Sequence, residues 1–177
     1  IASVGAVFLA TLLDPKFSWR SRSLSSIGEA TGQSLFALGS VDQLAFDVFN
    51  LGLVLAGVLG IPFLTLLWAD SETRIERLGL ALAAVTLLGS IGVAVAFLDG
   101  PFAAFHFVAA MTFFFGMTVA MWTYGTGLAR RTGSAHGLGA IWLANVHAVV
   151  WVGWMLLEAF LYTGDGDTWT YFAVPEF

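Results

Sequence analysis

The sequence contains no cysteine, and only 11% of its 177 residues are charged. The absence of cysteine excludes disulfides, thiolate metal sites and a cysteine nucleophile. The scarcity of charge is unusual, because Asp, Glu, Lys and Arg make up roughly a quarter of an ordinary soluble domain. Seven Lys and Arg stand against twelve Asp and Glu. Nucleic acid is therefore excluded as an expected partner, since no basic patch is available to bind phosphate.

Apolar residues are correspondingly abundant. They make up 58% of the chain, and the mean hydropathy is +0.86. A water-soluble core cannot absorb that much apolar surface, whereas a bilayer can. We predict an all-α integral membrane bundle with five transmembrane helices visible in this sequence and six in the full protein. The expected location is the cell membrane, which the chain crosses several times.

The chain divides into apolar runs long enough to span and short polar connections. Asp14-Pro15 is expected to end the first run, and the Ser40-x-x-Gln43 pattern resembles a capping box that opens the second. The first run is about 20 Å long as a helix, which predicts a chain that begins inside a helix; a signal peptide is the alternative. We predict one domain over 1–177, with helices over 1–13, 42–68, 72–98, 101–124 and 137–162, a polar loop over 14–41 and a tail over 163–177.

Orientation and packing follow from simple patterns. Basic residues in short loops favour the cytoplasmic side, which predicts that the loops carrying Arg74, Arg77, Arg130 and Arg131 are cytoplasmic. Small residues that recur every four positions allow helices to approach closely. Such stripes, together with a histidine that we expect to hydrogen-bond to a neighbouring helix, define the predicted helix contacts: Gly52, Ala56, Gly60, Ala140, Ala144, Ala148 and His147.

A polar pocket is the sharpest functional hypothesis. Polar groups inside spans are costly, and four of them fall within roughly 5 to 10 Å of the outer face. The serine-rich first loop is expected to lie above them. An alternative is that the acids extend to the interface and the histidine bonds to a neighbouring carbonyl. The candidate pocket consists of Asp47, Asn50, His106, Glu158, Ser25 and Ser26.

No cofactor is predicted. Haem ligation by two histidines is disfavoured, because His147 lies roughly 15 Å deeper than His106. A metal held by Asp47, His106 and Glu158 is chemically feasible, but nothing in the spacing requires it. HExxH, GxSxG and glycine-rich phosphate-loop motifs are absent.

Several short segments resemble the domain-of-unknown-function 998 family of multi-pass membrane proteins, particularly its haloarchaeal members. They are Pro15-x-Phe17-Ser18-Trp19, Leu24-Ser25-Ser26-Ile27-Gly28, Phe49-Asn50-Leu51-Gly52-Leu53, His106 followed by Phe113-Phe114-Phe115, and Ala173-Val174-Pro175-Glu176-Phe177. The resemblance implies an archaeal, salt-loving host and a six-helix fold. The family often has Asp where Ser26 stands, and its last helix would continue past Phe177. No activity is established for the family, so the resemblance implies no reaction.

These patterns leave several functions open. The first is a non-enzymatic membrane component, either an accessory subunit or a bundle that binds lipid or a small molecule. Its expected partners are membrane lipids and another membrane-protein subunit. The alternative is an enzyme that acts on lipid or a lipid-linked substrate at the outer leaflet. A transporter is the third, although Pro62 is the one proline inside a predicted span that would interrupt a helix.

Overall fold

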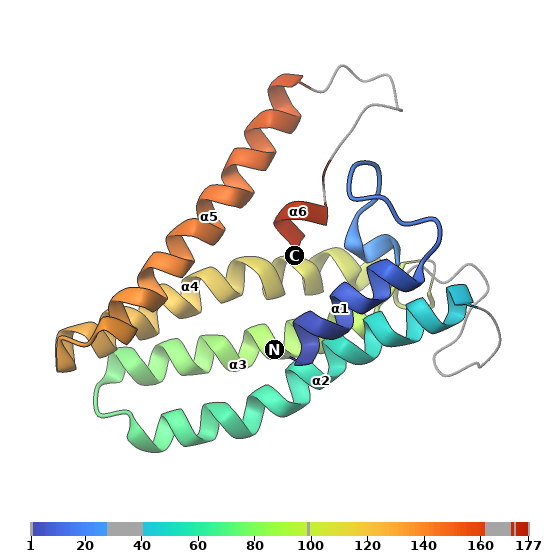
Figure 1. The fold of residues 1–177 in the computed structure, drawn as a ribbon. Coiled ribbons are helices and arrows are strands. Elements are labelled where there is room, and N and C mark those ends of the chain that lie inside the picture. Colours follow the sequence, from blue (N-terminus) through green and yellow to red (C-terminus); the bar gives the residue numbers. More distant parts are fainter. Residues whose placement is uncertain (1, 28–40, 99, 162–170, 172, 177) are drawn as a thin grey trace.

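The computed structural model describes residues 2–27, 41–98, 100–161, 171 and 173–176 (Figure 1). Over these ranges the chain is helical and contains no strand. The elements are α1 (Ala2–Leu13), η1 (Leu24–Ser26), α2 (Val41–Asp70), α3 (Arg74–Val95), η2 (Ala103–Phe105), α4 (His106–Thr132), α5 (Ala135–Leu161) and α6 (Ala173–Glu176). The predicted helical bundle is therefore confirmed.

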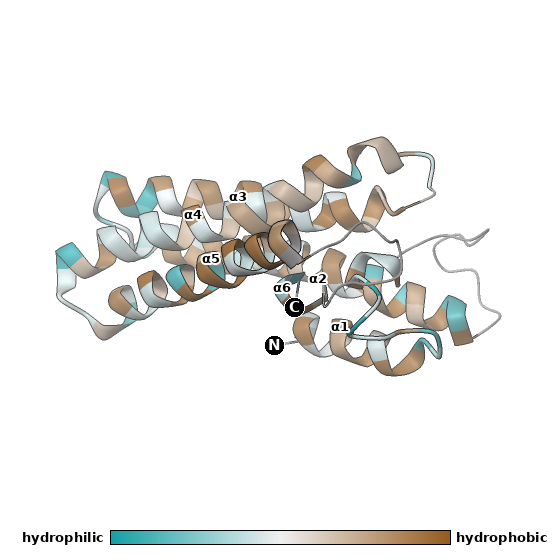
Figure 2. Ribbon diagram, turned by 90° about the horizontal axis from the view of Figure 1, so that it is seen from above, coloured by the Kyte–Doolittle hydropathy of each residue, from teal (hydrophilic) through white to brown (hydrophobic). Residues whose placement is uncertain are grey.

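Four of these helices are long and apolar enough to cross a membrane: Val41–Asp70, Arg74–Val95, Ala103–Thr132 and Ala135–Leu157. A shorter apolar helix covers Ser3–Leu13. Figure 2 shows hydrophobic residues along the middle of the long helices, with hydrophilic residues mainly at their ends and in the connections. Large apolar side chains point outward, as in Leu66, Val149 and Phe160, which are 71%, 69% and 81% exposed. Such a surface suits lipid and not water, which identifies a membrane protein.

The helices α2, α3 and α4 lie side by side, and α1 packs along α2 (Figure 1). α5 starts beside the end of α4 and then leaves the other helices at a steep angle, with α6 lying between α5 and α1. Glycines permit the closest contacts. A Cβ on Gly79 of α3 would overlap the backbone of Tyr124 on α4. Because these two helices are in backbone contact, a larger separation between them would reduce their contact area.

Several boundaries differ from the sequence prediction. The fourth helix does not stop at residue 124 but continues to Thr132, where Gly133 ends it with φ +62°. In its polar last turn, Arg131 binds Glu72 of the α2–α3 turn and Glu76 of the first turn of α3. The third helix ends at Val95 instead of residue 98, and the short helix η2 precedes α4. The predicted capping residue Ser40 lies outside the described residues.

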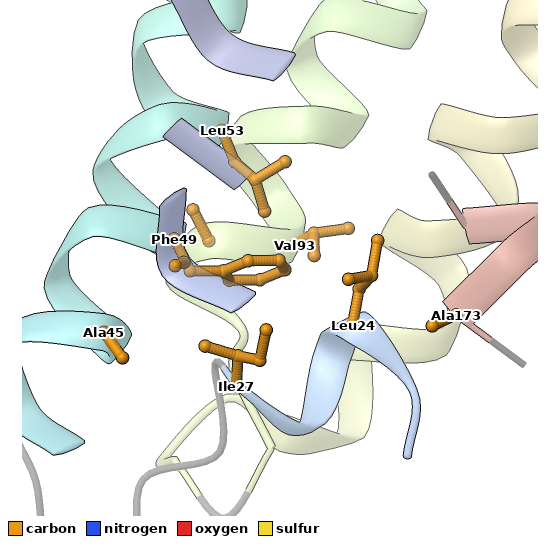
Figure 3. Close-up of a cluster of buried hydrophobic side chains, with 9 residues drawn as sticks. Leu24, Ile27, Ala45, Phe49, Leu53, Val93 and Ala173 are labelled. Atoms are coloured by element: carbon orange, nitrogen blue, oxygen red, sulfur yellow. The ribbon is translucent and has the colours of Figure 1, made fainter. Parts of the chain in front are cut away.

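The described part of the first loop folds over one end of the bundle. Leu24 and Ile27 insert among Phe49 and Leu53 of α2 and Val93 of α3 in one buried cluster (Figure 3). Ala173 of α6 joins the same cluster and has no exposed surface. Burial of these apolar side chains against one another anchors both the loop and α6 on the bundle.

Candidate functional site

Glu176 of α6 is a carboxylate placed against the first loop. It accepts hydrogen bonds from the backbone N–H of Leu24 and, at 2.9 Å, from Oγ of Ser25. These donors belong to η1, so the last described helix and the first loop meet through one side chain. The residues on the two sides of this contact are 151 positions apart in the chain.

Two adjoining cavities lie beside Glu176. The larger has a volume of about 90 Å³, and the smaller about 30 Å³. Both are lined by Val7 of α1, Leu53 of α2 and Phe113 of α4, and in both Glu176 is the ionisable residue among mostly apolar ones, with Ser3 in the larger wall and Ser25 in the smaller. The larger cavity also contacts Val4, which is 53% exposed, so it reaches the lipid-facing surface of α1.

Burial sets the protonation behaviour of Glu176. Removal from water raises the pKa of this carboxyl to about 7, although the hydrogen bonds from Ser25 and Leu24 favour its charged form. Near neutral pH the group therefore exists in both forms. A neutral carboxylic acid can donate a hydrogen bond, whereas a carboxylate can only accept. The polar end of the cavity can thus act as donor or acceptor for a bound molecule.

The loop that presents Ser25 is held by charged hydrogen bonds. Arg22 pairs with Asp14 over 2.9 Å and donates to Oγ and the carbonyl of Ser26, at 2.9 and 2.7 Å. Ser23 caps η1 by accepting from the backbone N–H of Ser26. Ser26, predicted as a pocket residue, is therefore occupied in supporting the loop, whereas Ser25 faces the cavity.

Asn50 and His106, two of the other predicted pocket residues, hydrogen-bond to backbone carbonyls away from this site. The buried side chain of Asn50 donates through Nδ2 to the carbonyl of Phe46 in its own helix, at 3.0 Å. Its Oδ1 has no hydrogen-bond partner among the described residues. Nδ1 of His106 lies 2.8 Å from the carbonyl oxygen of Ala96, which requires the tautomer protonated at Nδ1. Asp47 is half-buried, and the side chain of Glu158 lies outside the described residues.

Neither cavity beside Glu176 is lined by Asp47, Asn50 or His106. The pocket that the sequence suggested for these three residues and Glu158 stays a prediction. Within the described ranges, no three His, Asp or Glu side chains come together in a way that would hold a metal ion.

The small-residue stripe of α2 serves more than one purpose. A Cβ on Gly52 would lie 2.8 Å from Cβ of Ala6 on α1, so this position is a close helix contact. Ala56 lines the larger cavity, where a bigger side chain would fill it. A Cβ on Gly60 would meet the side chain of Leu87 on α3.

The stripe of α5 faces α4. A Cβ on Gly125 of α4 would lie 3.0 Å from Cβ of Ala140, Ala144 is fully buried, and Ala148 is half-buried. His147 of the same helix places Nδ1 2.6 Å from Oγ1 of Thr118 on α4. The helix contact of α4 and α5 is thus both close and polar.

Two carboxylates that connect distant segments of the chain were not predicted from the sequence. Glu176 lies in a tail that is too short to span a membrane. No pattern in the neighbouring sequence indicates that it contacts a loop 151 positions earlier. Glu76 was assigned no role, although the sequence Thr73-x-x-Glu76 is a capping-box pattern that could have drawn attention to it.

The fold and this cavity define a helical integral membrane protein with a mostly apolar internal site that ends in one ionisable group. No family profile, curated protein sequence or solved structure matches the chain.

Proposed function

We propose that this protein is a non-enzymatic, multi-pass component of the cell membrane that binds an aliphatic chain or a small apolar molecule between α1, α2, α4 and α6. The observation that carries the proposal is the cavity beside Glu176. Its walls are mostly apolar, and its one carboxyl group can orient a ligand through a hydrogen bond. Pockets for apolar ligands commonly combine hydrophobic walls with a few polar groups in this way.

The size of the cavity limits its ligand. About 90 Å³ accommodates the end of a chain or a small ring and not a whole lipid. The rest of a lipid would extend past Val4 into the bilayer. We also propose that the chain belongs to the domain-of-unknown-function 998 family, with an archaeal host, because of segments such as Phe49-Asn50-Leu51-Gly52-Leu53.

A second candidate function is that of an accessory subunit, and α5 favours it. Its side chains Val152, Leu156 and Leu157 are about half exposed, and an apolar groove of about 410 Å³ separates it from α6. A helix of another membrane protein would cover this surface. Neither the enzyme nor the transporter alternative has a comparable observation in its favour.

Filling the cavity tests the first proposal. Ala56→Phe places a ring in the cavity, whereas Val58→Phe adds a similar ring on the exposed side of the same helix. The protein is purified from membranes in mild detergent, and bound molecules are identified by native mass spectrometry. We expect a co-purifying apolar molecule in the unaltered protein and in Val58→Phe, and its loss in Ala56→Phe.

The same preparation distinguishes the two candidates. A stoichiometric protein partner without a cavity ligand would favour the accessory subunit. Isolation of the protein alone, with neither partner nor bound molecule, would contradict both.

A further inference from the structure

A second apolar groove lies at the opposite end of the bundle, between α2 and α3. The two helices touch at Gly57, where a Cβ would lie 2.9 Å from the carbonyl oxygen of Leu87, and they separate toward their connecting turn (Figure 1). Pro62 lies in α2 five residues after Gly57 and cannot donate a backbone hydrogen bond, which favours a bend in the helix. The groove that results has a volume of about 220 Å³.

The walls of the groove are almost entirely apolar. On α2 and α3 they include Ile61, Leu64, Thr65, Trp68, Ala81 and Ala84. The hydroxyl of Thr65 donates to the carbonyl of Pro62 at 2.6 Å, so its hydrogen is already used within α2. The small side chains of Ala81 and Ala84 leave room along α3, while Trp68 stands near the end of α2, where an indole suits the headgroup level. An occupant must therefore be aliphatic along most of its length.

Two arginines of the first α3 turns lie on the same face of the helix as the groove wall, closer to the α2–α3 turn. Arg74, Arg77, Ala81 and Ala84 are spaced at i, i+3, i+7 and i+10, which places them on one stripe of α3. Both arginines are exposed. Nη2 of Arg77 donates to the carbonyl of Ser71 at 3.2 Å, which holds its guanidinium beside the turn.

The acidic residues of the turn are directed elsewhere. Asp70, Glu72 and Glu76 all bind Arg131 of α4, at 3.9, 3.1 and 2.7 Å. Glu76 faces α4, since a Cβ on Gly127 would contact it. Arg77 follows Glu76 by one residue and so points about 100° away around the helix, toward the groove side. The positive charge of Arg74 and Arg77 is thus presented where the groove ends.

We propose that this groove binds an anionic phospholipid of the adjacent leaflet, with one chain along Ala81 and Ala84 and the phosphate-bearing headgroup at Arg74 and Arg77. Charge complementarity selects the occupant: an uncharged apolar molecule leaves the arginines unused, and a free anion leaves the groove unused. This site is separate from the cavity beside Glu176 and does not depend on the function proposed for it.

Titration of the purified protein tests the proposal. Phosphatidylglycerol and phosphatidylcholine with identical chains are added to the detergent-solubilised protein, and bound lipid is counted by native mass spectrometry. We expect tighter binding of phosphatidylglycerol. Arg77→Gln or Arg74→Gln should weaken it by roughly fivefold each, since one arginine near an anionic lipid contributes on that scale. Arg130→Gln, an exposed arginine at the end of α4, is the matched control and should change it little.

The groove itself is tested by Ala84→Phe, which should lower the binding of both lipids. Val85→Phe places the same ring at the next residue, which is 52% exposed and outside the groove, and should leave binding unchanged. Equal binding of the two lipids, an equal loss in Arg77→Gln and Arg130→Gln, or full binding by folded Ala84→Phe would each overturn the proposal. Ala56→Phe should retain the lipid preference even if it empties the other cavity.

Discussion

Arg131, near the end of α4, donates a hydrogen bond from Nε to Oε1 of Glu76 over 2.7 Å. Glu76 lies in the first turn of α3 and its side chain has no exposed surface. Its other oxygen accepts from the backbone N–H and the hydroxyl of Thr73, at 2.9 and 3.0 Å. The arginine also reaches Glu72 and Asp70. One guanidinium therefore fastens the α2–α3 turn to the end of α4.

This pair should contribute strongly to stability. Glu76→Gln leaves the Arg131 charge without its closest partner and places an amide N–H₂ among the donors of Thr73. We expect the midpoint of thermal unfolding in detergent to fall by more than about 5 °C. Glu72→Gln, at a side chain 73% exposed, should lower it by less than about 2 °C. Scanning fluorimetry measures both, and equal shifts would contradict the assignment.

The contact of α3 with α4 should not tolerate a methyl group at Gly79. Ala normally stabilises a helix by about 1 kcal/mol relative to Gly, but here its Cβ would overlap the backbone of Tyr124. We expect Gly79→Ala to destabilise the protein by about 1–3 kcal/mol. Gly139→Ala is the control, because no atom lies within 4 Å of a Cβ at Gly139. Chemical unfolding followed by circular dichroism should give opposite signs for the two variants.

Docking of α6 should depend on pH through Glu176. Its pKa rises to about 7 in the folded protein from an ordinary value of 4.5, so the folded state holds the proton more tightly. The stability of docking is then highest below about pH 4.5 and decreases as the pH rises to about 7. Glu176→Gln should remove this dependence.

The natural absence of cysteine permits a direct measurement of this docking. Ala173→Cys places a thiol at a position with no exposed surface, and Val174→Cys places one at a half-exposed neighbour. The ratio of their labelling rates by a maleimide cancels the titration of the thiols themselves. The labelling rate of Ala173→Cys relative to that of Val174→Cys should increase between pH 5 and 7. A constant ratio would argue against a role for Glu176.

The pair formed by Thr118 and His147 should contribute only modestly. Hydrogen bonds between helices inside a membrane average about 0.6 kcal/mol, because the separated helices also find polar partners. A double-mutant cycle with Thr118→Val and His147→Phe should give a coupling of this size, and no more than about 2 kcal/mol. A larger coupling would indicate that the pair belongs to a network with a function of its own.

The sequence by itself determined that this is a helical membrane protein. Apolar runs long enough to span, interrupted by polar turns, admit no other solution, because backbone polar groups in lipid must be satisfied within each helix. The sequence also suggested individual contact positions. Gly52, expected to be a helix contact, lies against Ala6, while Ser25, expected in a pocket with Asp47 and His106, lines a different cavity beside Glu176.

Only the tertiary structure decided which polar groups meet. Depth along a helix follows from residue number, but the direction of a side chain depends on how each helix is rotated against its neighbours. Asp47, Asn50 and His106 were predicted to share a level, and they line neither cavity beside Glu176, whereas Glu176 reaches Ser25 across most of the chain. The link from Glu76 to Arg131 likewise spans 55 positions. Such contacts come from packing between distant segments, and no local pattern in the sequence encodes them.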